Sequence, residues 1–118
     1  MAGFDEGIML DSEGRVCEAS AANILFVRSG ELITPALTPE VFPGITRSLV
    51  LELAAEMGCR IEECSIQPSD LGSFEAAFLA STLMELKPLR EISHHSYSSS
   101  SNPLFREILD RFRSITHQ

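Results

Sequence analysis

The sequence predicts a mixed α/β fold in which a strand-rich core carries two main helices. Short apolar runs separated by turn residues fill roughly the first 34 positions, which is typical of strands and hairpins. Two apolar repeats with helical spacing follow, one from about residue 45 to 57 and one after Asn102-Pro103. At 118 residues the chain is long enough to bury a core of its own, and we expect a single domain over residues 1–118.

Two hairpins are expected in the first third of the chain. Residues 7–10 are a short apolar run closed by a turn signal, Asp11-Ser12-Glu13-Gly14, and residues 15–18 follow as the return strand. Residues 23–27 and 31–34 flank a second turn at Ser29-Gly30. Antiparallel strands are therefore expected throughout this region.

The clearest helix is predicted behind a loop punctuated by Pro35, Pro39 and Pro43. Gly58 is well placed to end it. Its expected buried stripe follows a four-residue spacing and comprises Ile45, Leu49, Leu53 and Met57, widened by Val50 and Ala54.

The second half alternates short elements before a last helix. We expect an edge strand at 60–66, a helical turn at 68–71, and strands at 76–80 and 86–92. The serine-rich stretch at 96–101, which includes Tyr97, is interpreted as a flexible polar loop. The last helix has an expected apolar face of Leu104, Ile108 and Phe112, with Ile115 beside it.

Composition excludes several function classes. The net charge of −8, from 17 acidic and 9 basic residues, is unsuited to binding nucleic acid. No apolar run reaches the roughly 18 residues of a membrane span, and no secretory signal precedes the first strand, so a soluble cytoplasmic protein is expected.

Cysteine and histidine usage predicts neither disulfides nor a metal site. The three cysteines form no Cys-x-x-Cys pair and are expected to be reduced apolar fillers. His94, His95 and His117 have no acidic or cysteine companions at ligand spacing, and we interpret them as solvated.

Three segments stand out by their order and spacing. They are Asp5-Glu6-Gly7-Ile8-Met9-Leu10-Asp11 with Gly14 and Glu18-Ala19-Ser20-Ala21-Ala22-Asn23-Ile24-Leu25-Phe26-Val27, Thr34-Pro35 with Pro43-Gly44-Ile45-Thr46-Arg47, and Phe78-Leu79-Ala80-Ser81-Thr82-Leu83-Met84-Glu85-Leu86-Lys87-Pro88-Leu89. Together they resemble class IV pyridoxal-phosphate enzymes, the family of branched-chain and D-amino-acid aminotransferases and aminodeoxychorismate lyase. The resemblance covers about residues 3–92.

The resemblance implies the large C-terminal domain of these enzymes and a site for pyridoxal 5′-phosphate. Glu18 would pair with the pyridine nitrogen of the cofactor, where an acid is needed to keep the ring protonated. Gly44, Ile45 and Thr46 would hold the phosphate, which also suits the free N–H groups and dipole of a helix start.

Further positions have implied or alternative roles. Ser81 and Thr82 match a second phosphate contact, or they cap the next turn. Phe42 and Ile45 match positions beside the pyridine ring, or they are simple core residues. Arg47 is interpreted as structural, tying the helix start to nearby backbone or acidic groups.

The family's catalytic lysine would lie upstream of the first matching segment, so the resemblance assigns no catalytic residue to this chain. Lys87 is the only lysine, and we expect it to be an ordinary strand residue. Three hypotheses follow: an inactive cofactor-binding portion of a class IV aminotransferase, a small enzyme using Lys87, or a non-catalytic interaction module. An uncovered apolar face predicts a homo-oligomer, most simply a dimer. The glycine-free stretch at 93–102 favours the lyase over the aminotransferases.

Overall fold

The computed structural model describes residues 8–10, 16–19, 22–36, 44–81, 85–92 and 95–116, with side chains from residue 23 onwards. Within them the chain forms a mixed α/β fold, as predicted. The strands are β1 Ile8–Leu10, β2 Val16–Ala19, β3 Ala22–Arg28, β4 Glu31–Pro35, β5 Ile61–Cys64, β6 Ala76–Ser81, β7 Glu85–Leu89, β8 Glu91–Ile92 and β9 His95–Ser96. The helices are α1 Ile45–Glu56 and α2 Pro103–Thr116, with 3₁₀ turns η1 Pro68–Ser73 and η2 Ser99–Ser101.

Seven of the described strands form one mixed sheet around β3. Both predicted hairpins are confirmed, because β1 pairs with β2 and β3 pairs with β4, each antiparallel. The strand β6 pairs antiparallel with β3 on one edge and with β7 on the other, while β5 lies parallel to β4 at the edge predicted for it. On the remaining edge of β3, β2 pairs with Ala22 and Asn23 whereas β4 pairs with residues from Phe26 onwards. The two neighbours thus share one edge of β3 and separate near Asn23.

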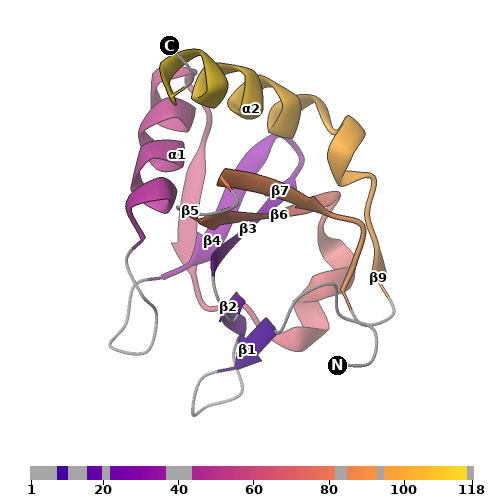
Figure 1. Ribbon diagram of the computed structural model, residues 1–118. Helices are drawn as coiled ribbons and strands as arrows, with labels where there is room; N and C mark the ends of the chain where they lie inside the picture. Colours follow the sequence, from indigo (N-terminus) through magenta and orange to yellow (C-terminus); the bar gives the residue numbers. More distant parts are fainter. Residues whose placement is uncertain are drawn as a thin grey trace.

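The central strands β3, β4 and β6 are buried on both faces of the sheet. Helices α1 and α2 cover one face, and η1 with the β8–β9 hairpin covers the other (Figure 1). Alternate residues of β3 enter opposite cores, since Leu25 and Val27 pack towards the helices while Ile24 and Phe26 pack towards η1. This alternation defines a helix face and an η1 face for every neighbouring strand.

The first helix lies where the sequence predicts it, and Val50, Leu53 and Ala54 of the predicted stripe are buried, but the first turn differs from the prediction. The stripe comprises Thr46, Arg47, Val50, Leu53 and Ala54. Ile45, predicted to be buried, is 81% exposed. The spacing of apolar residues predicted the wrong buried positions in the first turn. Thr46 and Arg47 are polar and were not expected to be buried, yet both face the sheet.

The end of α1 is set by glycine, as expected. Gly58 has φ +77°, a left-handed conformation that glycine adopts without steric cost. Its N–H donates to the Ala55 carbonyl, and the Cys59 N–H donates to the Ala54 carbonyl. These two bonds close a Schellman motif.

The predicted strand at 86–92 and polar loop at 96–101 need correction. The strand breaks at Arg90, so that Glu91–Ile92 leave β7 and pair with His95–Ser96 instead. The serine-rich stretch packs at two positions: Tyr97 and Ser99 are buried, and the Tyr97 hydroxyl donates to the Leu71 carbonyl. The local composition favoured a loop, because it gives no sign that Tyr97 packs into the core on the η1 face.

The last helix begins at Asn102-Pro103 as predicted. The Asn102 side chain caps it by accepting a hydrogen bond from the Phe105 N–H at 3.1 Å. Its buried residues are Phe105, Ile108 and Phe112, whereas Ile115, which was predicted to lie beside them, is 46% exposed. Phe105 packs against Phe78 of β6 with ring centroids 5.0 Å apart.

Candidate functional site

A row of paired residues crosses three strands at one end of the sheet. The Cα of Glu18 in β2 is paired with that of Asn23 in β3, which is paired in turn with that of Ala80 in β6. Of Glu18 the structure describes the backbone alone. Ala80 belongs to the core under α1, so the row emerges on the helix face.

The start of α1 lies directly on this row. A Cβ placed on Gly44, the N-cap residue of α1, would overlap the Oδ1 atom of Asn23. Asn23 is itself buried. The close approach therefore requires glycine at position 44, and it brings the helix start next to the strand partner of Glu18.

The helix start has no cap from its own side chains. The first intrahelical bond runs from the Ser48 N–H to the Gly44 carbonyl at 3.1 Å, so the amides of Ile45, Thr46 and Arg47 have no acceptor within the helix. Gly44 makes no side-chain cap, and the first turn contains no acidic residue. An uncapped helix start of this kind favours an anion through its N–H groups and its dipole.

Arg47 anchors this first turn, as the sequence interpretation expected. The side chain is only 3% exposed. Its Nη2 atom donates to the Pro35 carbonyl at 3.1 Å and to Glu63 Oε1 at 2.7 Å. Pro35 and Cys64 are paired at the ends of β4 and β5, so the guanidinium ties the helix to the ends of two parallel strands.

Thr34 holds the end of β4, which Arg47 contacts through the Pro35 carbonyl. The Val27 carbonyl accepts from the Glu75 N–H on the β6 side, so strand alternation directs the Ile24 carbonyl to the opposite edge of β3. The antiparallel register places Pro35 there, which has no N–H to donate. The buried Thr34 hydroxyl donates to the Ile24 carbonyl instead, at 2.9 Å.

The structure brings some of the predicted site residues together and leaves others apart. Gly44, Ile45 and Thr46 lie at the helix start, and the Glu18 backbone lies beside Asn23. The Thr46 side chain is buried. The exposed Ile45 side chain is not a core residue, and this removes the simple packing interpretation for it.

Of the second predicted phosphate contact, Ser81 and Thr82, the structure describes only Ser81. Ser81 ends β6, where alternation along the strand puts it on the face of Leu79, away from Ala80. Thr82 and Phe42 lie outside the described residues.

Asn23 and Thr34 are the site residues to which sequence reasoning assigned no role. Asn23 stands at the head of an otherwise apolar strand, and this was the signal that could have singled it out. For Thr34 the available signal was the proline that follows it.

Other chemically interesting side chains lie elsewhere. Lys87 is paired with Leu79, which places it on the η1 face, away from α1. Burial raises the pKa of the Cys59 and Cys64 thiols, which disfavours their reactive thiolate forms. Within the described part of the chain no group of histidine, cysteine and acidic residues could hold a metal ion, and no helix has the length and apolar content to cross a membrane.

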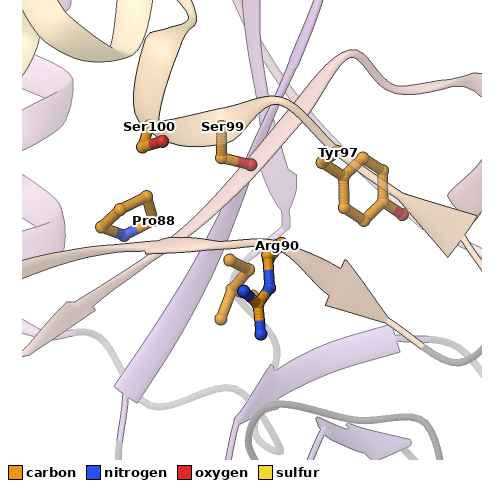
Figure 2. A pocket seen from close by; sticks show the side chains of 6 residues that line it. Pro88, Arg90, Tyr97, Ser99 and Ser100 are labelled. Atoms are coloured by element: carbon orange, nitrogen blue, oxygen red, sulfur yellow. The ribbon is translucent and has the colours of Figure 1, made fainter.

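The pocket shown in Figure 2 is also separate from the helix start. It measures about 90 Å³ and is lined by Pro88, Leu89, Arg90, Tyr97, Ser99 and Ser100. The Arg90 guanidinium extends away from Ser99 and Ser100 in this view. The Tyr97 hydroxyl already donates to the Leu71 carbonyl, and Ser99 Oγ accepts from the Ala77 N–H. These partners make it a packing feature.

Comparison with known proteins gives a consistent answer. The family model for amino-transferase class IV matches residues 1–92. A probable branched-chain-amino-acid aminotransferase of Synechocystis is 33% identical over 113 residues, covering 96% of this chain and 35% of the relative. The chain thus spans about a third of the length of the curated relatives it matches.

Solved structures agree with the sequence comparison. The branched-chain amino acid aminotransferase of Thermobaculum terrenum, in its PLP form, superposes with a TM-score of 0.89 at 33% identity, over 94% of this chain and 37% of that one. The 4-amino-4-deoxychorismate lyase of Pseudomonas aeruginosa also gives 0.89, at 27% identity, over 97% of this chain and 42% of that one. By sequence and by fold, this chain belongs to the aminotransferase class IV family.

Proposed function

We propose that the chain is the cofactor-binding C-terminal part of a pyridoxal-phosphate aminotransferase, which acts on a branched-chain amino acid when complete. The observation that carries this proposal is the convergence of the uncapped start of α1 with the strand row of Glu18, Asn23 and Ala80. A phosphate needs donors, and a protonated pyridine nitrogen needs a carboxylate. The start of α1 supplies the donors, and we propose that the Glu18 side chain supplies the carboxylate.

The first turn of α1 and Glu18 have separate roles in this proposal. The amides of the first turn and the Thr46 hydroxyl bind the phosphate, because the N-cap glycine has no side chain and the first turn contains no acidic residue. The Glu18 carboxylate keeps a proton on the ring nitrogen. Ile45 offers an exposed apolar surface to the ring. When bound, pyridoxal phosphate withdraws electrons from the reacting carbon of the substrate.

The chain by itself is proposed to bind without turnover. In the family resemblance, the lysine that bonds the cofactor lies upstream of Glu18. The alternative amine, Lys87, shares a sheet face with Leu79 rather than with the start of α1, and this speaks against the hypothesis of a small enzyme.

We propose that the residues that select the substrate lie in the remainder of the complete enzyme. We propose further that the complete enzyme is a homodimer in the cytoplasm. Light scattering of the complete enzyme tests the dimer.

A direct test is calorimetric titration with pyridoxamine 5′-phosphate, which has no aldehyde to react adventitiously with amines. Glu18→Gln removes the charge opposite the ring nitrogen and is expected to weaken binding about tenfold. Thr46→Val removes a single donor and is expected to weaken it about threefold.

Glu62→Gln, an exposed change on β5, is the matched control and leaves the affinity unchanged. The absence of binding at millimolar ligand by the folded wild-type chain would refute the proposal. Equal affinities of the wild type and Glu18→Gln would refute the role of Glu18.

A lyase is the second candidate. The structure of 4-amino-4-deoxychorismate lyase covers 97% of this chain, and residues 93–102 contain no glycine. Because the remainder of the complete enzyme is proposed to select the substrate, both activities are assayed with the complete enzyme. Amino-group transfer from a branched-chain amino acid supports the first candidate, whereas consumption of 4-amino-4-deoxychorismate supports the second.

A further inference from the structure

The first turn of α1 is fixed to the sheet at two points. On one side, the Gly44 backbone lies against the Asn23 side chain of β3. On the other side, the Arg47 guanidinium reaches the Pro35 carbonyl and the Glu63 carboxylate. Two contacts on different strands fix both the position and the direction of the turn between them.

The Arg47 contact has the geometry of an anchor and not of a ligand group. The side chain is 3% exposed, and its Nη2 atom is shared between two acceptors of this chain. Glu63, by contrast, is 45% exposed, so water solvates part of its carboxylate. The positive charge of Arg47 is thus paired within the protein, which leaves little of it for an incoming phosphate.

We propose that Arg47 is a positioning residue, and that its ion pair with Glu63 sets the selectivity of the site for a phosphate-bearing pyridine over the same pyridine without phosphate. This inference rests on the proposed function and deepens it. The anchor fixes the turn that carries the amides of Ile45 and Thr46, and donors fixed in advance favour a phosphate more than donors that must first be ordered. Loosening the anchor is expected to weaken binding of the phosphate group and to leave binding of the ring unchanged.

The quantity to measure is a ratio of affinities, for pyridoxamine 5′-phosphate against pyridoxamine. A general loss of folded protein lowers both affinities together and leaves the ratio unchanged. Arg47→Lys keeps the charge but replaces the fork of donors with a single ammonium group. Glu63→Gln keeps the shape of the side chain and removes its charge. Each variant is expected to lower the ratio about fivefold.

The matched control is Glu31→Gln. It removes the carboxylate of the Arg60–Glu31 pair, whose atoms lie 3.6 Å apart at the opposite end of the same two strands. The control is expected to keep the wild-type ratio. Circular dichroism of every variant establishes that the comparison is made between folded proteins.

Three outcomes would overturn the inference, and they are distinguishable. Unchanged ratios in folded Arg47→Lys and Glu63→Gln reject the anchor and leave the proposed function intact. A higher ratio in Glu63→Gln means that Arg47 acts on the phosphate directly through its released charge, and this also rejects positioning. A wild-type chain that does not prefer the phosphate-bearing compound rejects both proposals. If Arg47→Lys does not fold, Glu63→Gln decides, since Glu63 is half exposed.

Discussion

The starts of the two helices differ in how their free amides are satisfied. At α2, Asn102 accepts the hydrogen bond of the Phe105 N–H, so the chain closes this helix start with its own side chain. At α1, the N-cap residue is Gly44, which has no side chain to do so. Both starts are built among buried polar residues. Such residues in the described chain are Asn23, Thr34, Thr46 and Arg47 near α1, and Ser99 and Asn102 near α2.

This difference distinguishes buried polar residues that only stabilise the fold from buried polar residues that shape a binding site. Near α2, Asn102 caps the helix and Ser99 Oγ accepts from the Ala77 N–H. Near α1, the Thr34 hydroxyl and the Arg47 guanidinium donate to strand carbonyls, and the N-cap residue is a glycine. Polar groups that hold the backbone of a helix start whose N-cap has no side chain are the arrangement expected of an anion-binding site.

The largest effect is expected at the open helix start. Gly44→Ala forces a Cβ against the buried Asn23 amide and is expected to lower the free energy of unfolding by about 2 kcal/mol. Urea denaturation measures the change. The double variant Gly44→Ala with Asn23→Ala removes the overlapping atoms and should recover part of the loss. If the two single changes simply add, the contact is not the cause.

A smaller effect is expected at the closed helix start. Asn102→Ala removes the cap of α2 and is expected to lower the free energy of unfolding by about 1 kcal/mol. The affinity for pyridoxamine 5′-phosphate should not change, because this helix start is remote from the proposed site. A weakened affinity in calorimetry, with the fold intact, would break the distinction between the two helix starts.

The smallest effect concerns Tyr97 and is confined to alkaline solution. Burial raises the pKa of Tyr97 to about 12, from an ordinary value of 10.0. A raised acid pKa means that the folded state favours the neutral phenol. Its contribution to stability is therefore complete below pH 10 and is lost as the pH rises towards 12.

Denaturation of the wild type and of Tyr97→Phe between pH 9 and pH 11 tests this effect. The phenylalanine variant starts less stable because the Leu71 carbonyl loses its donor, by about 1 kcal/mol. The gap between the two proteins should narrow as the pH rises above 10. A constant gap would show that the phenol is not held neutral by burial.

Much of the fold follows from local pattern. The turn at Ser29-Gly30, the stop at Gly58 and the cap at Asn102 were all visible in the sequence, because each depends on the chemistry of one or two residues. The break at Arg90 and the packed serine stretch were not visible, since they depend on how Tyr97 meets the distant Leu71 carbonyl.

The sequence by itself determined both helices, the first two hairpins, the family resemblance and the residue types that a pyridine phosphate requires. Only the tertiary structure decided that Thr46 and Arg47, not Ile45, face inwards, and that Asn23 lies against Gly44. The physical reason is that periodicity records the apolar content of a helix face, whereas the orientation of this first turn is set by polar partners on β3, β4 and β5. Those partners are distant in sequence and become neighbours only when the sheet forms.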